Sequence, residues 1–416
     1  MCMVIGWMGE IPSYAKERIV IGGRLRGRDG AGYWTNSKTY RTLDINEVPP
    51  FVMQSDEMLA NFRATPTTEA ETQLNYLQPY DGIVHNGIIS NDKVYGDFPI
   101  DSMALPEIFS NREGDFVKQA QKIVGSYAIA FFNSKSLVLI TNYKPIYYKR
   151  FSQGFAFASM PEPLGREAIP LKPYTVNIID KKNFQIFTEE IPRNSYSDRA
   201  VVAASSGLDS TTVAYLLKSQ GKDVTLAHFI YKCLAQENEV NRILRIAEHG
   251  GFGLTLIEIP NVFSGTIVEG TYKKDGISGT EYAHDWVSAR NLVMTSLLTA
   301  FAESNKIGIV ATGGNLEESG AYPDNEHEFG RMVNNVLPYA VQNGLEIRFE
   351  QPLSNYMKHE IVKIGQELGV PWHLTWSCYS DKQEPCGKCG PCYMRRIAFE
   401  RNGLVDPLLI GGQGES

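Results

Sequence analysis

The chain has 416 residues and a formal net charge of −7; 43% of its residues are hydrophobic and 21% are charged. This globular composition, enough for about two domains, excludes a disordered, collagen-like or coiled-coil chain, and the negative charge excludes a global basic field for nucleic acid. No apolar run approaches the roughly 20 residues that span a bilayer, and the N-terminus lacks the basic residues that open a signal peptide, so we expect a soluble, cytoplasmic protein without a membrane partner.

Short apolar runs with few breaks dominate the first half of the chain and predict β-strands. Three of them cover residues 124–132, 137–141 and 154–159. At residues 190–199 the apolar pattern gives way to a polar stretch with one proline, which is typical of a linker. We therefore expect a β-rich domain before this stretch.

In the second half of the chain, candidate strands alternate with candidate helices. The strands cover residues 199–204, 224–231 and 307–312, and the helices cover residues 210–220 and 239–249. Such alternation is typical of a parallel sheet whose two faces are covered by helices. We therefore expect an α/β protein of two domains. The first domain covers residues 1–190, the linker 191–198 and the second domain 199–416.

Cys2 directly follows the first methionine. If Met1 is removed, Cys2 carries a thiol and a free α-amine, whose ordinary pKa of about 7.7–8.0 lets it act as the base for its own thiol near pH 7. The alternative is a small apolar residue on the first strand. The motifs that follow in the same half favour the nucleophile.

Three segments of the first half, residues 23–32, 61–65 and 84–89, resemble motifs of the class II glutamine amidotransferases. The last of them contains His-Asn-Gly-Ile-Ile and matches that family's turn almost letter for letter. The resemblance implies an αββα sandwich of the N-terminal nucleophile (Ntn) type. It also implies that Cys2 attacks glutamine and releases ammonia.

The same resemblance assigns the remaining groups of a glutaminase site. Asn86 and the backbone amide of Gly87 would form the oxyanion hole for the tetrahedral intermediate. Arg63 would clamp the α-carboxylate of glutamine in a bidentate pair. Asp101 would take the α-ammonium group. Glutamine is therefore the expected nitrogen donor.

The turn after the first strand of the second half reads Ser-Ser-Gly-Leu-Asp-Ser at residues 205–210. Small residues at this place let backbone N–H groups approach a phosphate, and the following helix N-terminus favours an anion. No Lys-Ser/Thr pair follows, so the turn is not a Walker A loop; the alternative is an ordinary strand-to-helix turn. It resembles the SGGxDS signature of the PP-loop ATP pyrophosphatases. Ser206 replaces a glycine there, and a serine fits if its φ is negative.

Four of the six cysteines fall within 15 residues near the C-terminus. A disulfide framework would spread its cysteines and would need an oxidising compartment, so this cluster indicates a metal. Thiolates at this spacing suit a tetrahedral, structural zinc site, because four sulfur ligands leave no position for a reacting water. The candidate ligands are Cys378, Cys386, Cys389 and Cys392.

Residues 376–399, which include this cluster, closely resemble the C-terminus of the 7-cyano-7-deazaguanine synthases, the QueC family. Residues 284–291, 313–329 and 352–365 are similar to further segments of that family in the same order, so the resemblance covers roughly residues 199–407. It implies a PP-loop (HUP-like) parallel α/β sheet. It also implies an AMP-forming enzyme that activates the carboxylate of 7-carboxy-7-deazaguanine with ATP and amidates it to an amide and then a nitrile.

The QueC resemblance also implies roles for individual residues. Arg290 and Lys358 would offset negative charge on phosphate or on the acyl adenylate. The ATP phosphates, with Mg²⁺, would be held by Ser205, Ser206, Gly207, Asp209 and Ser210. The deazapurine would be held by Glu318, Tyr322, Pro323 and Asp324, since a carboxylate accepts the donors of a guanine-like edge.

The chain also departs from the family pattern. Residues 231–236 stand where the family has Tyr-Gly-Gln-Arg-His, and Asn325 stands where it usually has cysteine. Proteins of the QueC family have nothing like residues 1–195, so the N-terminal half is interpreted separately.

The leading hypothesis is a glutamine- and ATP-dependent ligase that acts on the carboxylate of a 7-deazaguanine. A first alternative keeps the activation but conjugates the deazapurine to an amine of a protein or other macromolecule, in a role such as antiviral defence. A second alternative is a protein that binds ATP or a deazapurine without turnover. The sequence leaves open the exact purine, the product, the removal of Met1 and whether the chain forms a homo-oligomer.

Overall fold

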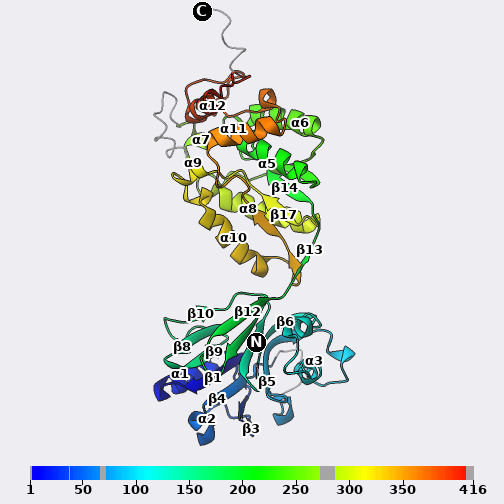
Figure 1. The fold of residues 1–416 in the computed structure, drawn as a ribbon, viewed down its shortest axis with the longest axis vertical. Helices are drawn as coiled ribbons and strands as arrows, with labels where there is room; N and C mark the ends of the chain where they lie inside the picture. The colour runs from blue at the N-terminus through cyan, green and yellow to red at the C-terminus, as the bar shows by residue number, and fades with distance from the viewer. Residues whose placement is uncertain (1, 37, 66–71, 272–285, 409–416) are drawn as a thin grey trace, which may run out of the picture. The chain divides into compact units, whose positions relative to one another are not determined.

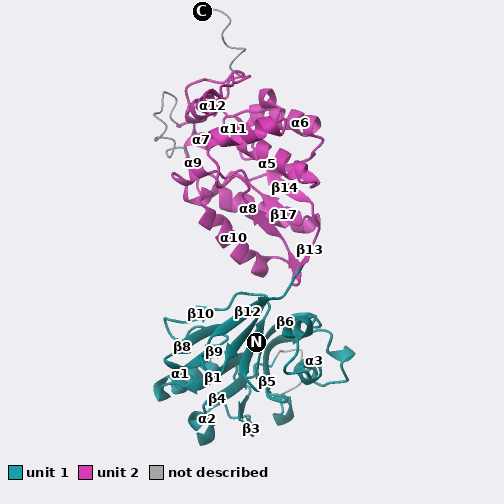
Figure 2. Ribbon diagram, in the orientation of Figure 1, with its two compact units in different colours: residues 1–193 teal, residues 194–416 magenta. Residues whose placement is uncertain are grey.

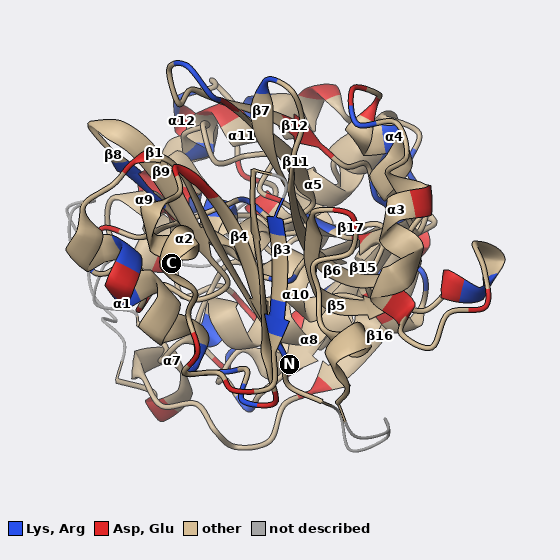
Figure 3. Cartoon of the chain, turned by 90° about the horizontal axis from the view of Figure 1, so that it is seen from below, with Lys and Arg blue, Asp and Glu red and all other residues tan. Residues whose placement is uncertain are grey.

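The computed structural model describes residues 2–36, 38–65, 72–271 and 286–408. The chain divides into two compact units, residues 1–193 and 194–416 (Figure 2). In the described residues no helix is both long enough and apolar enough to cross a membrane. Basic and acidic residues alternate on outer elements such as α1 (Ser13–Gly23), as Figure 3 shows.

The first unit contains two antiparallel sheets (Figure 1). The seven-stranded sheet has the order β10-β8-β9-β1-β4-β2-β3, and the five-stranded sheet has the order β12-β11-β7-β6-β5. The strands are β1 (Met3–Glu10), β2 (Ala31–Thr35), β3 (Lys38–Thr42), β4 (Glu57–Phe62), β5 (Ile83–Ile89), β6 (Gly125–Phe132), β7 (Ser136–Thr141), β8 (Tyr147–Phe151), β9 (Gln153–Ala158), β10 (Ile169–Pro170), β11 (Thr175–Asp180) and β12 (Ile186–Glu190). The other helices are α2 (Pro50–Gln54), α3 (Leu105–Ile108) and α4 (Phe116–Ala120).

The alternation of side chains along β1 explains the layers of this unit. Val4 and Met8 point inward and pack against the second sheet. Met3, Ile5 and Trp7 point to the opposite face, which α1 and α2 cover. The outer face of the second sheet packs against α3 and α4. The unit is therefore an αββα sandwich, which confirms the fold expected from the sequence.

The second unit contains a five-stranded parallel sheet of order β16-β15-β14-β17-β19 and a two-stranded pair, β13-β18. Its strands are β13 (Asn194–Ser195), β14 (Ala200–Ala203), β15 (Val224–Ile230), β16 (Gly253–Glu258), β17 (Ile309–Ala311), β18 (Leu345–Glu346) and β19 (Arg348–Glu350). Its helices are α5 (Leu208–Ser219), α6 (Gln236–Gly250), α7 (Thr266–Glu269), α8 (Arg290–Ser304), α9 (Leu316–Ser319), α10 (His327–Ala340), α11 (Lys358–Glu367) and α12 (Gly390–Glu400).

Helices cover both faces of this sheet. Val202 points to the face covered by α5, α6 and α11, and its neighbour Val201 points to the face covered by α8 and α10. The expected α/β class with a covered parallel sheet is therefore confirmed. All eight predicted strands and helices quoted above are present, with ends within three residues of the prediction.

The strand order decides where a ligand site can form. The chain runs from β14 outward to β15 and β16, then returns to the other side of β14 with β17. The order therefore reverses between β14 and β17, and ligands of open parallel sheets bind at the carboxyl ends of the strands beside such a switch point.

Candidate functional site

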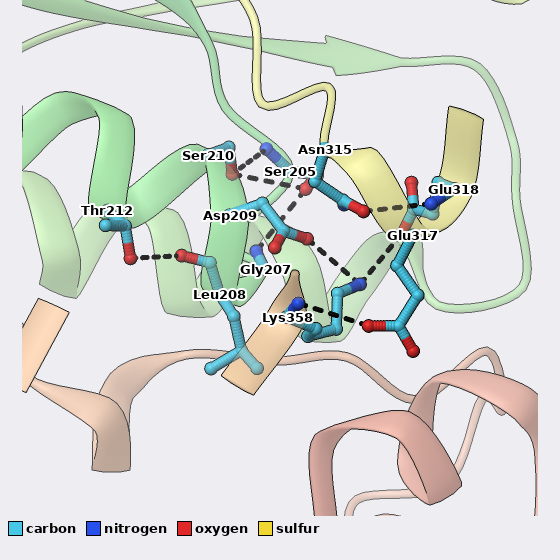
Figure 4. Close-up of polar contacts among 10 residues, drawn as sticks. All are labelled: Ser205, Gly207, Leu208, Asp209, Ser210, Thr212, Asn315, Glu317, Glu318 and Lys358. Carbon is cyan, nitrogen blue, oxygen red and sulfur yellow. Dashed lines mark hydrogen bonds and ion pairs between the residues drawn. The ribbon is translucent and has the colours of Figure 1, made fainter. Parts of the chain in front are cut away.

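The turn between β14 and α5 lies at the carboxyl end of the central strand, and its side chains hold its shape (Figure 4). The backbone N–H of Ser205 donates to Ser210 Oγ at 3.2 Å, and the N–H of Gly207 donates to Ser205 Oγ at 3.3 Å. Gly207 is the residue that precedes the first turn of α5. The open N-terminus of a 12-residue helix therefore faces the turn, an arrangement that suits an anion.

Ser206 adopts a left-handed backbone conformation with a φ of +61°. The condition under which a serine fits here without strain, a negative φ, is therefore not met. The conformation costs a serine about 1 kcal/mol. The carbonyl of Ser206 accepts the backbone N–H of Trp376 at 2.8 Å, so a contact far along the chain stabilises the turn. Its hydroxyl is buried, and no described residue gives it a hydrogen-bond partner.

Lys358, the first residue of α11, joins this turn to α9 by two ion pairs (Figure 4). Its Nζ lies 3.1 Å from Asp209 Oδ2 and 2.7 Å from Glu318 Oε1. Burial alone would lower the pKa of Lys358, but the two carboxylates raise it. Burial raises the pKa of Asp209 to about 6, against the effect of Lys358. When all three groups are ionised, the cluster carries one net negative charge.

A cavity of about 270 Å³ opens beside this cluster, near the lower end of the range for small-molecule sites. It brings together nine of the eleven residues predicted for the second unit's ATP, charge-offsetting and deazapurine contacts. These are Ser205, Gly207, Asp209, Ser210, Arg290, Glu318, Tyr322, Asp324 and Lys358.

The remaining two, Ser206 and Pro323, do not line the cavity.

An aromatic pair forms part of the cavity wall. The rings of Trp286 and Tyr322 are stacked, with centroids 6.2 Å apart and an angle of 21° between their planes. Such a pair offers a flat apolar surface to a planar ring. Trp286 was not predicted as a site residue, although it belongs to the 284–291 segment. The first two residues of that segment, 284 and 285, lie outside the described residues.

Arg290 begins α8 and lines the same cavity. Burial opposes its charge, but Tyr231 and Asp324 are among the groups that raise its pKa. In turn, burial raises the pKa of Asp324, and the charge of Arg290 opposes that rise. Arg290 therefore stays a cation in a cavity whose other charged groups are mostly carboxylates.

The four clustered cysteines converge just before and at the start of α12. Their sulfur atoms all lie within 4.8 Å of one another, near the edge of about 3.8 Å that four thiolates around a zinc ion would form. The backbone N–H of Cys386 donates to Cys378 Sγ at 3.3 Å, and the N–H of Cys389 donates to Cys386 Sγ at 3.3 Å. Gly387 between them has a φ of +69°, which favours glycine. The chemistry and geometry of this sulfur set therefore fit a zinc ion.

In the first unit, Cys2 lies directly before β1. Met3 pairs with Phe62 in the β1–β4 register, which places Cys2 beside Arg63 at the end of β4. The Cys2 thiol lies 4.0 Å from the carbonyl oxygen of Ala64. Burial raises the pKa of this thiol, while the charge of Arg63 lowers it and that of Asp101 raises it. Arg63 and Asp101 therefore both lie within electrostatic reach of the Cys2 thiol.

Asn86 and Gly87 lie in β5 of the second sheet. The side chain of Asn86 is buried, and both its amide atoms lack a hydrogen-bond partner within the described part of the chain. Gly87 has a φ of +152°, and a Cβ there would lie 1.9 Å from the carbonyl oxygen of Ser126. Only glycine therefore fits at position 87, and Asn86 keeps a polar group available for a ligand.

Asp101 is held in place by a buried network. Its Oδ2 accepts the N–H of Ile89 at 2.7 Å, and its Oδ1 accepts the N–H and the hydroxyl of Ser102 at 2.7 and 3.1 Å. Ser102 Oγ also lies 2.9 Å from His85 Nδ1 and accepts from Gln78 Nε2 at 3.1 Å. The network thus ties Asp101 to the strand that carries Asn86.

Sequence analysis missed several residues of both sites. Ser102 directly follows the predicted Asp101, and His85 directly precedes the predicted Asn86, so their places in the sequence were the available signal. Glu239 and Thr295, which line the cavity of the second unit, belong to no quoted motif. No local pattern distinguishes them from ordinary helix residues.

Known proteins resemble both halves of the chain. A family model described as "Queuosine biosynthesis protein QueC" matches residues 199–403. A protein of Sulfolobus acidocaldarius named 7-cyano-7-deazaguanine synthase is 36% identical, over 98% of this chain and 99% of its own length. A protein of Saccharolobus solfataricus with the same name is 39% identical, over 84% of this chain and 83% of its own length.

Other relatives are shorter. A protein of Methanothrix thermoacetophila, also named 7-cyano-7-deazaguanine synthase, is 34% identical over 50% of this chain and 97% of its own length. The expectation that such proteins have nothing like residues 1–195 is therefore wrong for the Sulfolobus relative, which this chain matches almost from end to end. The reason is that both short and two-part proteins carry the same name.

Solved structures give only a distant similarity. The glutamine phosphoribosylpyrophosphate amidotransferase of B. subtilis, complexed with ADP and GMP, is 13% identical, with a TM-score of 0.38 over 98% of this chain and 100% of that chain. This similarity is too low to bear on the arrangement of the chain.

Proposed function

The chain belongs to the QueC family of 7-cyano-7-deazaguanine synthases, and from this premise we propose that it is a glutamine- and ATP-dependent ligase. It adenylates the carboxylate of a 7-deazaguanine, such as 7-carboxy-7-deazaguanine, and amidates it toward an amide or a nitrile. The observation that carries the proposal is the single cavity that joins the phosphate-binding turn to Arg290, Asp324 and the Trp286–Tyr322 pair.

The first step forms the acyl adenylate. A carboxylate oxygen of the deazapurine attacks the α-phosphorus of ATP, and pyrophosphate leaves with the electron pair of the broken P–O bond. The open N–H groups at the N-terminus of α5 bind phosphate oxygens. Arg290 offsets the charge that develops on the adenylate.

Magnesium fits the charge of this site. Asp209 Oδ1 is buried, and no described residue offers it a hydrogen bond; carboxylate oxygens are typical ligands of Mg²⁺. Asp209 would hold the ion, which supplies positive charge to the ATP phosphates. This charge is needed because Asp209, Glu318 and Lys358 together carry one net negative charge before ATP binds.

The deazapurine ring is assigned to the other end of the cavity. Tyr322 and Trp286 offer the stacking surface, and Asp324 accepts the donors of the guanine-like edge. Glu318 was predicted to contact the base, but its Oε1 is bound to Lys358 at 2.7 Å. We therefore assign Glu318 to the positioning of Lys358 and leave the base to Asp324.

The first unit supplies ammonia. The Cys2 thiolate attacks the side-chain carbonyl carbon of glutamine, and the collapse of the tetrahedral intermediate releases ammonia and leaves a thioester that water hydrolyses to glutamate. The Asn86 amide and the Gly87 N–H stabilise the oxyanion of that intermediate. Arg63 and Asp101 hold the α-carboxylate and α-ammonium groups of glutamine. Asp101 can do so because its carboxylate is fixed by the N–H groups of Ile89 and Ser102.

Zinc has a structural role in this proposal. Four sulfur ligands would complete the coordination of a zinc ion at this cluster and would leave no position for a reacting group. The cluster contributes by holding residues 376–379, since Trp376 and Tyr379 line the cavity beside Cys378.

The test is formation of AMP from ATP and Mg²⁺ in the presence of 7-carboxy-7-deazaguanine and either glutamine or ammonium, with products weighed by mass spectrometry. We expect glutamine nitrogen in an amide or nitrile product. AMP formation without transfer of glutamine nitrogen would contradict the role of the first unit. The absence of AMP formation with every nitrogen donor would contradict the proposal as a whole.

One observation favours a second candidate. Residues 232–236 differ from the family's usual run, and they directly follow Tyr231, which lines the cavity. An altered segment beside the cavity would suit a larger acceptor, such as an amine of a protein. In that case the deazapurine mass would appear on a macromolecule in the same assay. A protein that only binds its ligands would show no ATP–pyrophosphate exchange.

A further inference from the structure

One carboxylate of the cavity has no part in the roles assigned above. Glu239 lies in the first turn of α6 and lines the cavity together with Ser205 and Arg290. The thiol of Cys233 donates to its Oε2 at 4.0 Å. Within the described ranges, no lysine or arginine forms an ion pair with Glu239. It therefore presents an acceptor oxygen to the cavity without the cation that neutralises Asp209 and Glu318.

The surroundings of Glu239 bring the pKa of its carboxyl group close to neutral pH. Burial raises its pKa to about 7, against the effect of Arg290. The groups that interact electrostatically with Glu239 do not titrate in this range: burial raises the pKa of Cys233 to about 12 and also raises that of Tyr231, while Arg290 stays protonated. His228 also lines the cavity, and burial lowers its pKa. A base with a pKa near the working pH is suited to general base catalysis.

We infer that Glu239 is the proton acceptor for the nitrogen nucleophile that attacks the acyl adenylate, an inference that rests on the proposed function. The lone pair of ammonia forms the new C–N bond at the carbonyl carbon. The bond between this carbon and the phosphate oxygen breaks, and AMP leaves with its electron pair. One N–H proton passes to the Glu239 carboxylate, which returns it to solvent after the product has formed.

The position and charge of Glu239 favour this role over two other roles, contact with the ATP phosphates and contact with the base. A carboxylate is unsuited to contact ATP phosphates, because like charges repel. The base edge has its own acceptor in Asp324. Arg290 acts electrostatically on Glu239, Glu318 and Asp324, so Glu239 lies within electrostatic reach of the cation assigned to the charge on the adenylate.

The experiment compares Glu239→Gln and Glu239→Asp with the wild type in two separate reactions. The first is ATP–pyrophosphate exchange driven by 7-carboxy-7-deazaguanine, which reports adenylation. The second is amide formation from ammonium in a single turnover at constant free ammonia, which does not depend on Cys2. Glu237→Gln is the matched control, since Glu237 is an exposed carboxylate two residues earlier in the same helix.

We expect E239Q to keep its exchange rate within about twofold of the wild type and to form amide about 10²–10³-fold more slowly. E239D should recover part of the lost amidation rate. The control variant E237Q should keep the wild-type rate of amide formation. The wild-type amidation rate should rise with pH through an inflection near 7 that E239Q lacks. Asp209 also titrates in this cavity, near 6, and its inflection should persist in the variant.

The outcomes separate the inference from the proposed function. If E239Q forms amide at the wild-type rate, or loses exchange and amidation equally, Glu239 is not the proton acceptor. A raised KM for the deazapurine with unchanged kcat would assign Glu239 to substrate binding instead. If the wild type shows no deazapurine-dependent exchange, the proposed function itself fails, and this inference fails with it.

Discussion

Nζ of Lys358 lies 2.7 Å from Oε1 of Glu318, although 40 positions separate the two residues. The same ammonium group also reaches Asp209 at 3.1 Å. One cation at the start of α11 thus holds together the turn at residues 205–210 and α9 (Figure 4), and the cavity forms beside this junction.

Removal of this cation should affect both stability and adenylation. Lys358→Met leaves two buried carboxylates without their partner, which costs about 3–5 kcal/mol of unfolding free energy. We expect the urea midpoint to fall and ATP–pyrophosphate exchange to drop at least about 100-fold. Lys363→Met is the control, because Lys363 is exposed on the same helix. Exchange at the wild-type rate in folded K358M would contradict the role of Lys358.

Loss of the Cys2 thiol should separate the two activities. In Cys2→Ala, glutamine-dependent amidation should fall at least about 10³-fold, since no other group supplies the nucleophile. Amidation with ammonium should stay within about twofold of the wild type, and this arm serves as the control for folding. Glutamate release, measured by chromatography, reports the hydrolysis directly. Unchanged glutamate release in C2A would show that Cys2 is not the nucleophile.

The network around Asp101 should control the affinity for glutamine. Ser102→Ala removes the hydroxyl that donates to Asp101 and contacts His85 and Gln78. A buried hydrogen-bond partner lost in this way costs about 1–3 kcal/mol. We expect KM for glutamine to rise about tenfold, with ammonium-dependent activity unchanged. Ser152→Ala, at an exposed serine of the same unit, should leave KM unaltered. An unaltered KM in S102A would exclude this positioning role.

The titration of Glu239 should also appear in the stability of the protein. Its pKa rises from an ordinary value of 4.5 to about 7 in the folded state, so the folded state binds the proton more tightly. The resulting stability is fully present below pH 4.5 and is lost as pH rises through 7.

Glu239→Gln cannot lose a proton and should escape this loss. We therefore expect E239Q to have a higher free energy of unfolding than the wild type at pH 8, by on the order of 1–3 kcal/mol. The difference in free energy of unfolding should be smaller at pH 5.5. Equilibrium unfolding at the two pH values measures the difference. If E239Q is less stable than the wild type by the same amount at both pH values, then Glu239 is ionised in the folded state and its charge stabilises the fold.

Removal of the metal from the cysteine cluster should destabilise the adjoining wall of the cavity. We expect one zinc ion per chain by elemental analysis. Cys389→Ser, or treatment with a strong chelator, should remove the ion, lower the Tm and reduce ATP–pyrophosphate exchange, because Trp376 and Tyr379 flank Cys378 in the cavity wall. Cys233→Ser, which changes a buried cysteine outside the cluster, should keep its zinc. A purified chain that is fully active without metal would contradict the structural role.

Local chemistry explains which parts were predictable. The alternating strands of the first unit, the strand–turn–helix at residues 205–210 and the cysteine spacing at residues 378–392 all depend on near neighbours in the chain. The φ of Ser206 was not predictable, because its carbonyl is held by Trp376, which lies 170 positions away.

The sequence by itself determined the periodicity of the strands and helices, the small-residue turn at residues 205–210 and the thiol cluster, since each is a pattern within a short stretch of chain. The tertiary structure alone decided that Lys358 is paired with Asp209 and Glu318, and that Glu239 opens into the same cavity. The physical reason is that burial and charge set the protonation and the partners of these groups. Both depend on side chains that only the packing of α6, α8, α9 and α11 around the sheet brings together.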